Sequence, residues 1–302
     1  MNIFITGGLG FVGRHLSTTL LDDGHNVTAV GRTPNPKAMI DHPFFHYLAA
    51  DTTKPGDWQK QVPEHDIVIN LAGKSIFTIW TKQVKEQIYN SRIATTRNVA
   101  DSLAGAAGDK LLISTSAVGY YGDRGEDILT EKEPPGDDFL SDVGKDWEHE
   151  ALKAQTDSIR VVLPRFGIVL GEGGGAMASM IPAFKMFLGG RLGSGQQWFP
   201  WVHMEDLTAA YQFIINNKNI SGPVNLCAPQ PVRNVELTRA LAKQLNRPVM
   251  LPMPSLMMKT MLGEFGQVLL CSQRARPAAL LDAGFHFTYP DLNSALDDIV
   301  ED

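Results

Sequence analysis

Residues 2–14 read NIFITGGLGFVGR, an apolar run that leads into a glycine-rich turn and then into an amphipathic stretch. A strand, a tight turn and a helix in this order are typical of the start of a dinucleotide-binding βαβ unit. Gly7 allows the tight turn, Gly10 lets the backbone approach a pyrophosphate, and Gly13 permits close packing of the helix on the strand. The free N–H groups at the start of the helix would face the phosphates. This segment therefore predicts a dinucleotide site.

The second apolar strand, residues 25–30, is followed by Gly31-Arg32-Thr33, with no carboxylate at its tip. An Asp or Glu at this tip usually binds the ribose 2′-hydroxyl of NAD, whereas an Arg accommodates the 2′-phosphate of NADP. Arg32 therefore predicts NADP(H) as the cofactor. The alternative is an exposed loop arginine without a ligand.

The length and composition of the chain limit the classes of protein to which it can belong. A length of 302 residues favours one large α/β unit with a smaller lobe. The net charge of −6 argues against general nucleic-acid binding, which requires a basic surface. The sequence contains no long apolar run, so we expect no membrane span. The first residues are predicted to enter a strand directly, so we expect no signal peptide. The two cysteines, Cys227 and Cys271, are far apart, which predicts reduced thiols in a cytoplasmic protein without a metal site.

Strand-like runs alternate with helical stretches along the chain, which predicts an α/β fold with a doubly wound parallel sheet of the Rossmann type. Further strands are expected at residues 66–71, 110–114, 159–163 and 224–227. Helices are expected at residues 12–21, 81–104, 142–154, 176–188, 206–216 and 234–245. Asp206 and Asn234 each precede an apolar periodic run, so both are predicted to be N-caps.

The chain is predicted to contain two domains. A Rossmann domain is expected at residues 1–165, its sheet completed by a strand near residues 224–227, and a substrate lobe at residues 166–302. Two glycine-rich segments, residues 171–175 and 189–195, indicate functional loops of this lobe. A small carboxy-terminal domain would begin near residue 247 and end in an acidic helix. Its methionine cluster at residues 253–261 is expected to pack within the lobe.

Two strand ends resemble motifs of the short-chain dehydrogenases/reductases. Residues 66–73, DIVINLAG, resemble the NxAG strand of that superfamily, and residues 114–122, STSAVGYYG, resemble its SSAxVYG element. The resemblance implies that Ser116 is the substrate-binding serine. The alternative is a strand end in which Ser and Thr side chains bond to the local backbone.

The acid/base motif of that superfamily, YxxxK, is incomplete in this chain. Its tyrosine transfers the proton, and its lysine lowers the pKa of the tyrosine and holds the ribose. Lys145 matches the lysine, but Ser141 stands at the tyrosine position. Tyr120 or Tyr121 could supply a phenol from the neighbouring loop, and apolar packing of these rings is the alternative. Residues 142–150 would also serve as an amphipathic surface helix.

Motifs along nearly the whole length resemble those of the epimerase-like atypical short-chain dehydrogenases/reductases, which carry a small carboxy-terminal domain. The motifs are GGxGFVG, NLAG, SAVGYYG, KDWE, RFGIVLGEGGGA, GGRLGSGQQWFPWVHMEDL and LLDAGFHFTYP. Arg92 stands where ordinary extended members carry an asparagine beside the cofactor, and a surface salt bridge is its alternative role. The cofactor-binding residues expected on this basis are Gly7, Gly10, Phe11, Val12, Gly13, Arg32, Asp51, Leu71, Ala72, Gly73, Arg92 and Lys145.

Residues 189–203 resemble the substrate-lobe region of sugar-nucleotide epimerases, where aromatic and amide side chains could hold a polar planar ligand. The substrate-binding candidates are Arg191, Gln197, Trp201 and His203. The alternatives are a core position for Trp201 and a structural histidine at His203.

These observations favour an NADP(H)-dependent oxidoreductase or epimerase that exchanges a hydride with a small polar or nucleotide-linked substrate. The catalytic candidates are Ser116, Lys145, Tyr120 and Tyr121. The alternative is a non-catalytic NADP(H)-binding redox sensor or partner-binding module, which the missing tyrosine favours. We expect a small-molecule substrate, no nucleic-acid or membrane partner, and a homodimer as the candidate assembly.

Overall fold

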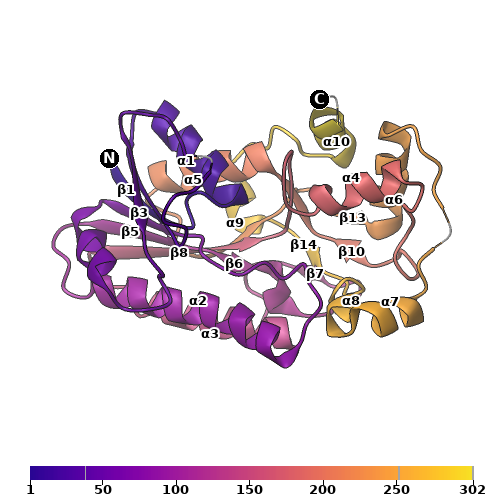
Figure 1. The fold of residues 1–302 in the computed structure, drawn as a ribbon, viewed down its shortest axis with the longest axis horizontal. Helices are drawn as coiled ribbons and strands as arrows, with labels where there is room; N and C mark the ends of the chain where they lie inside the picture. Colours follow the sequence, from indigo (N-terminus) through magenta and orange to yellow (C-terminus); the bar gives the residue numbers. More distant parts are fainter. Residues whose placement is uncertain (38, 251, 301–302) are drawn as a thin grey trace.

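An eight-stranded parallel sheet forms the centre of the larger lobe in the computed structural model, which describes residues 1–37, 39–250 and 252–300 (Figure 1). Its strands are β1 (Asn2–Thr6), β2 (Asn26–Gly31), β3 (Phe45–Ala49), β4 (Ile67–Asn70), β5 (Lys110–Ser114), β6 (Ser116–Ala117), β8 (Ile159–Phe166) and β12 (Gly222–Leu226). Seven of them follow the order β12-β8-β5-β4-β1-β2-β3, and β6 pairs with β8. The strand order reverses between β1 and β4, the place where open α/β sheets bind ligands. The predicted Rossmann-type fold is therefore confirmed.

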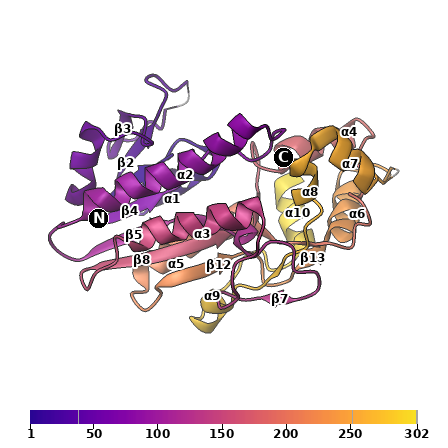
Figure 2. The ribbon, with the colours of Figure 1, turned by 90° about the horizontal axis from the view of Figure 1, so that it is seen from below.

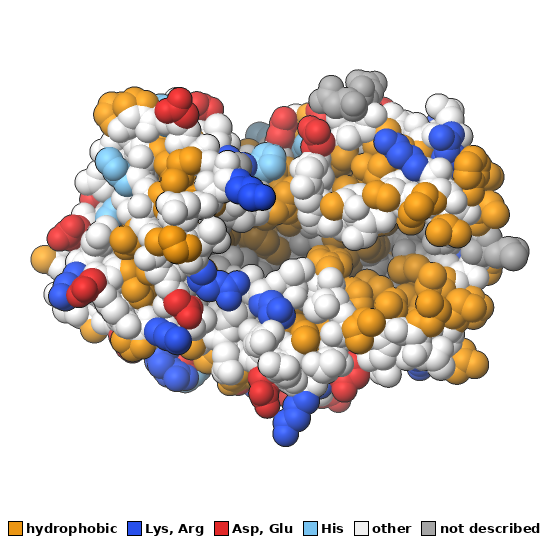
Figure 3. Space-filling view, viewed as in Figure 1, with side chains coloured by type: hydrophobic (Ala, Val, Ile, Leu, Met, Phe, Trp, Pro, Cys, Tyr) orange, Lys and Arg blue, Asp and Glu red, His pale blue; other side chains and the backbone are white. Residues whose placement is uncertain are grey.

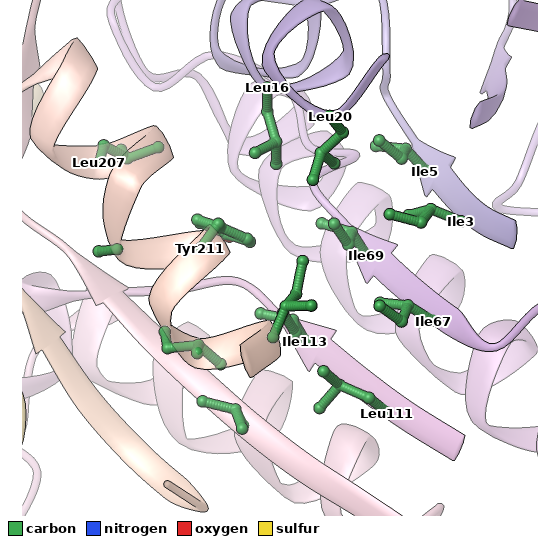
Figure 4. Close-up of a cluster of buried hydrophobic side chains, with 14 of the residues drawn as sticks. Ile3, Ile5, Leu16, Leu20, Ile67, Ile69, Leu111, Ile113, Leu207 and Tyr211 are labelled. Atoms are coloured by element: carbon green, nitrogen blue, oxygen red, sulfur yellow. The ribbon is translucent and has the colours of Figure 1, made fainter. Parts of the chain in front are cut away.

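Helices cover both faces of this sheet. In Figures 1 and 2, α2 (Lys82–Leu103) and α3 (Phe139–Leu152) lie on one face, and α1 (Phe11–Asp22) and α5 (Met204–Asn216) lie on the other. Strand side chains alternate between faces, and the α1–α5 face holds one continuous apolar cluster (Figure 4). Fully buried members of this cluster include Ile3, Ile5, Leu16, Leu20, Ile69, Ile113, Leu207 and Tyr211.

The smaller lobe is built from segments that follow β8. Its helices are α4 (Met177–Lys185), α6 (Asn234–Gln244), α7 (Ser255–Leu262), α8 (Glu264–Val268) and α10 (Leu292–Val300). Short strands pair as β9 (Ile168–Leu170) with β11 (Trp201–His203), and as β10 (Trp198–Phe199) with β13 (Val232–Arg233). The larger lobe adds β7 (Ile128–Leu129), which pairs with β14 (Arg274–Ala275), and α9 (Ala278–Asp282) lies against β12. Short 3-10 helices span Asp57–Glu64 and Val118–Tyr121. Within the described ranges, no helix has the length and apolar character needed to cross a membrane.

The predicted strands and helices are all present, but two predicted caps are wrong. Asp206 lies inside α5, and the N-cap is His203, whose Nδ1 accepts a hydrogen bond from the Glu205 N–H at 3.3 Å. The Asp206 carboxylate instead accepts bonds from the N–H groups of Thr288 (2.7 Å) and Tyr289 (3.0 Å). This residue therefore anchors the carboxy-terminal segment on α5.

Asn234 is the first residue of α6 rather than its N-cap, which is Arg233. The Asn234 side-chain oxygen accepts a hydrogen bond from the Leu192 N–H at 2.9 Å. Its polar side chain therefore holds the glycine-rich loop before β10.

The predicted packing of the methionine cluster is only partly correct. Met258 is fully buried, but Met257 and Met261 on α7 are exposed, as is Leu256. Leu251, which begins the LPMPSLMMKTML segment, and residues 301–302, at the end of the predicted acidic helix, lie outside the described residues.

Candidate functional site

The glycine turn after β1 brings the start of α1 against the end of the strand. Gly7 has a φ of +71°, a conformation that favours glycine. A Cβ at Gly13 would collide with the carbonyl oxygen of Gly7 and lie 2.8 Å from the Cα of Gly8. A Cβ at Gly10 would meet only the Gly7 oxygen, at 3.1 Å. No side chain caps α1, so its first N–H groups are open to an anionic group.

A cavity of about 510 Å³ runs from this turn to the smaller lobe (Figure 3). Its wall contains many of the predicted cofactor-binding residues, namely Gly7, Gly10, Phe11, Val12, Gly13, Leu71, Gly73 and Arg92. The smaller lobe contributes apolar side chains to the other end, among them Leu192, Trp198, Phe199, Phe265 and Leu269. One continuous space therefore joins the dinucleotide turn to an aromatic pocket.

The glycine-rich segment at residues 171–175 closes over the start of α1. A Cβ at Gly174 would collide with the ring of Phe11, and a Cβ at Gly175 would lie 2.7 Å from the same ring. Because neither position has room for a side chain, the loop backbone packs directly on Phe11 at the edge of the cavity.

Arg32 and Asp51 lie beyond the cavity wall, close to the tips of the neighbouring strands β2 and β3. Arg32 is exposed. The Asp51 carboxylate accepts hydrogen bonds from the hydroxyl of Thr53 (2.7 Å) and from its N–H (3.2 Å). The hydrogen bond from the Thr53 hydroxyl lowers the pKa of Asp51, and the charge of Arg32 makes a smaller contribution in the same direction. The Asp51 side chain is therefore ionised at neutral pH. Ala72, between Leu71 and Gly73, is likewise absent from the wall.

Arg92 reaches the cavity from α2. Its Nη1 donates to the carbonyl oxygens of Lys74 (2.9 Å) and Ile88 (3.1 Å), and its guanidinium lies 5.1 Å from the ring of Trp147. A Cβ at Gly73 would lie 3.2 Å from the guanidinium carbon, so glycine is what allows this approach. Desolvation lowers the pKa of Arg92 to about 10, which leaves the group charged at neutral pH.

The charges of the cavity wall have one sign. Among the described residues that line the cavity, Lys74 and Arg92 are the cations, and none is Asp or Glu. No ion pair joins either cation to a carboxylate within the described part of the chain. A positive wall of this kind suits a ligand that carries phosphates.

Helix α3 presents an apolar face to the cavity, formed by Leu140, Val143, Gly144 and Trp147. Lys145 lies outside the wall, and its Nζ pairs with Asp142 at 2.8 Å on the exposed side of the helix. Ser141 is buried, and its hydroxyl donates to the Gly119 carbonyl oxygen at 3.2 Å. The cavity-facing pairs four residues apart are therefore Leu140 with Gly144 and Val143 with Trp147, and none of these residues is an acid or a base.

The two candidate tyrosines have different surroundings. Tyr120 lines the cavity, and its ring centre lies 3.7 Å from the guanidinium carbon of Arg165. Tyr121 is fully buried outside the wall, where its hydroxyl donates to Asn225 (2.6 Å) and accepts from Arg165 (2.9 Å). Burial raises the pKa of Tyr121. Of the two tyrosines, only Tyr120 lines the cavity.

Ser116 lies in the cavity wall and is bonded to a buried ion pair that the sequence analysis did not identify. Its hydroxyl donates to Glu148 Oε1 at 2.7 Å. Arg165 binds both oxygens of Glu148, with Nε–Oε1 and Nη2–Oε2 distances of 2.7 and 2.8 Å. Glu148 belongs to the KDWE motif and Arg165 begins the RFGIVLG motif, so this ion pair joins two of the motifs that carry the family resemblance.

Of the four substrate-binding candidates, the structure brings only Gln197 to the cavity. Arg191 donates to the nearby Ser194 carbonyl oxygen at 3.1 Å and does not line the wall. Trp201 is buried in the core of the smaller lobe. His203 is buried as the N-cap of α5, and its ring centre lies 3.9 Å from that of Tyr289. Trp201 and His203 therefore take the structural positions that were their alternatives.

Comparison with known proteins agrees with this geometry. Residues 3–227 match the NAD dependent epimerase/dehydratase family, and residues 253–299 match a domain of unknown function, DUF1731. The chain is 38% identical to the epimerase family protein YfhF of Bacillus subtilis, over 100% of this chain and 99% of that protein. It is also 38% identical to the chloroplastic SDR39U1 homolog of Arabidopsis thaliana, over 100% of this chain and 87% of that protein.

A solved structure of human epimerase family protein SDR39U1 with NADPH superimposes with a TM-score of 0.88, at 31% identity, and covers 100% of this chain and 99% of that chain. The match extends through both the sheet and the carboxy-terminal region. The chain therefore belongs to the NAD dependent epimerase/dehydratase family of NAD(P)-binding short-chain dehydrogenase/reductase-like proteins, with a DUF1731 domain at its carboxy terminus.

Proposed function

We propose that this chain binds NADP(H) in the cavity and exchanges a hydride with a small, largely apolar ligand held against the smaller lobe. The observation that carries this proposal is the single cavity that contains the Gly7–Gly13 turn, Ser116, Tyr120 and an aromatic pocket. A dinucleotide on the turn would extend its reactive end toward the middle of this space. The bound cofactor would supply or accept the hydride.

The side chains around the cofactor end support NADP(H). The N–H groups at Phe11 and Val12 would bind the pyrophosphate at the start of α1. Arg92 would add a charge to the same end of the cavity, and Arg32 at the tip of β2 would pair with the 2′-phosphate. The presence of NADPH in the human SDR39U1 structure favours the same cofactor.

Tyr120 is the proposed proton donor or acceptor of the reaction. It is a tyrosine of the cavity wall, whereas the facing side of α3 carries no acid or base. General acid/base catalysis by a positioned side chain contributes about 10²–10⁴-fold to a rate.

The wall favours an apolar ligand over the nucleotide-linked substrate expected from the sequence. Phe77, Trp198, Phe199 and Phe265 line the cavity together, and the candidate Arg191 does not reach it. Pockets of this kind bind ring systems with a small number of polar groups.

Cofactor binding and hydride transfer should be measured separately. Titration with NADPH and NADH, for the wild type and for Arg32→Ala, is expected to show a preference for NADPH that the substitution removes. Equal affinities of the wild type for the two cofactors would contradict the assignment of Arg32. Hydride transfer is then tested with 4-deuterated NADPH and a panel of aromatic ketones and keto-sugar nucleotides, with deuterium in the alcohol product as the readout.

A second function, NADP(H) binding without turnover, is favoured by one observation. Leu140 and Gly144 stand on the face of α3 that looks into the cavity, where an acid and a cation would be needed. Tight NADPH binding with no deuterium transfer to any carbonyl compound of the panel would support this second function.

A further inference from the structure

We propose that Ser116 offers the cavity only a hydrogen-bond acceptor, so that the ligand group beside it must be a donor, either a hydroxyl or an N–H. This inference deepens the proposed function, and rests on it, because it names the chemistry of the ligand at the same site. It follows from a chain of buried hydrogen bonds whose direction is fixed at every member.

The chain begins at Asn225, which is fully buried. Its amide nitrogen donates to two backbone carbonyl oxygens, those of Leu129 and Arg276, both at 3.0 Å. A carbonyl oxygen can only accept, so these two bonds fix the orientation of the amide. The Asn225 side-chain oxygen therefore faces Tyr121 and accepts its hydroxyl proton, at 2.6 Å.

The donor and acceptor of the next hydrogen bond, between Tyr121 and Arg165, are fixed in the same way. A phenol has one proton, and that of Tyr121 is already donated to Asn225. The Tyr121 oxygen can therefore only accept, and it does so from Arg165 Nη1 at 2.9 Å. A guanidinium has donors and no acceptor, so the other nitrogens of Arg165 must also find acceptors.

Glu148 supplies those acceptors. Arg165 Nε and Nη2 donate to its two oxygens at 2.7 and 2.8 Å, a bidentate pair that holds the carboxylate in its ionised form. An ionised carboxylate has no proton to donate. Ser116, at 2.7 Å from Oε1, must therefore be the donor in the bond that joins them.

The hydroxyl proton of Ser116 is thus committed to the buried side. Ser116, Glu148 and Arg165 are 1%, 7% and 3% exposed, so the bonds that join them are shielded from bulk solvent. A hydrogen bond to a charged acceptor is among the strong ones, which opposes rotation of the hydroxyl toward the cavity. What remains for a ligand is the pair of lone pairs on Ser116 Oγ.

A carbonyl oxygen placed beside Ser116 would meet these lone pairs without a proton between them. An alcohol or an N–H group would donate into them. The site is therefore selective for the donor form of a ligand, which in a redox pair is the alcohol rather than the ketone.

The test compares pairs of ligands in which a methyl group replaces the proton of the one donor. Binding of 1-indanol and 1-methoxyindane, and of indole and N-methylindole, is measured by ligand-observed NMR on the NADPH-loaded protein, a state in which an alcohol cannot lose a hydride to the cofactor. We expect each donor to bind about tenfold more tightly than its methylated partner, about 1.4 kcal/mol. In Ser116→Ala the ratio should fall to about one. Ser75→Ala, a serine of the same wall that is outside the chain of bonds, should keep the wild-type ratio.

A second variant removes the acceptor that holds the Ser116 proton. In Glu148→Leu, no carboxylate accepts the Ser116 hydroxyl proton, which is then free for the cavity, so 1-indanone should gain affinity relative to 1-indanol. If this variant does not fold, because Arg165 loses its charged partner, the Ser116→Ala ratio decides the outcome.

Equal affinities within the wild-type pairs, including no measurable binding of either member, would overturn the proposal, as would a preference that persists in Ser116→Ala. Failure of the proposed function would be distinguishable from this result. The wild type would still bind the donor ligands more tightly than their methylated partners, but no deuterium would be transferred from NADPH.

Discussion

Gly10 and Gly13 occupy the same turn but tolerate a side chain differently, because a Cβ at Gly13 meets backbone that cannot move aside and a Cβ at Gly10 faces the cavity. Gly13→Ala is expected to destabilise the protein by about 1–3 kcal/mol, in the range of overpacked positions. Gly10→Asp should leave the melting temperature of the cofactor-free protein unchanged and abolish NADPH binding, since its charge would meet the pyrophosphate. Thermal denaturation without cofactor and an NADPH titration measure the two effects.

Gly10→Ala serves as the control for the charge. It should weaken NADPH binding less than Gly10→Asp, because it adds a methyl group without a negative charge. Retained NADPH affinity in a folded Gly10→Asp variant would show that the pyrophosphate does not lie on this turn.

Tyr120 and Tyr121 are adjacent in sequence, yet a Tyr→Phe change should have a different effect at each. Tyr120→Phe is expected to lower turnover about 10²-fold or more and to leave NADPH affinity and stability unchanged, because the hydroxyl it removes is the proposed acid. Tyr121→Phe removes the hydrogen bonds that Asn225 Oδ1 and Arg165 Nη1 make to the buried hydroxyl, which costs about 1–3 kcal/mol of unfolding free energy. Steady-state kinetics and denaturant unfolding separate the two roles. If neither Tyr120→Phe nor Tyr121→Phe changed turnover, neither tyrosine would act as the acid, and the non-catalytic function would be favoured.

At the scale of the element, the orientation of α3 decides which cation can reach the cofactor. Lys145 pairs with Asp142 on the exposed face, whereas Arg92 of α2 lies in the cavity wall. Arg92→Ala is therefore expected to weaken NADPH binding at least tenfold, and Lys145→Ala to change it by less than about twofold, since exposed ion pairs contribute little. Isothermal titration of NADPH measures both. A larger loss in Lys145→Ala than in Arg92→Ala would mean that the helix turns its other face to the cofactor.

The elements themselves were largely predictable, because apolar periodicity decides which segments are buried. The main exception is β3, Phe45–Ala49, an edge strand whose sequence FHYLA mixes polar and apolar residues and was not predicted. The two- and three-residue strands β6, β7, β9, β10, β11, β13 and β14 were not predicted either, because so short a run carries no periodicity. Helix starts were less accurate. The start of α3 lies three residues before the predicted one, because the Asp138 carboxylate accepts a bond from the Ser141 N–H at 2.8 Å. Asp206 resembles a cap in sequence but is bonded to a distant segment, and no local pattern reports such a contact.

For the molecule as a whole, the site depends on contacts between segments that lie far apart in the sequence. Phe265 of α8 lies 6.0 Å, centre to centre, from both Phe77 and Trp80, and Lys85 pairs with Glu264 at 2.6 Å. The glycine turn was predictable because its residues are consecutive. The aromatic end was not, because Phe77, Trp198 and Phe265 reach one cavity wall only after the smaller lobe folds back toward α2. The same limit applies to Ser116 and Glu148, whose bond spans 32 residues.

A buried histidine couples the larger lobe to the carboxy-terminal helix and should make stability depend on pH. His203 caps α5 through Nδ1, and its Nε2 lies 3.2 Å from Asp298 of α10. Desolvation lowers its pKa below the ordinary value of 6.5, even though the nearby carboxylates act in the opposite direction. Protonation also removes the lone pair that accepts the Glu205 N–H.

Because the unfolded state binds this proton more readily, the contribution of His203 to stability is complete above pH 6.5 and declines as the pH falls below that value, by at most about 1.4 kcal/mol per pH unit. His203→Asn keeps a capping oxygen and cannot titrate. Urea unfolding between pH 7.5 and 5 is therefore expected to show a shallower decline in unfolding free energy for the variant than for the wild type. His25 and His65, whose pKa values burial also lowers, would account for the decline that remains. Parallel curves for the two proteins would mean that His203 does not change its protonation state on unfolding in this range.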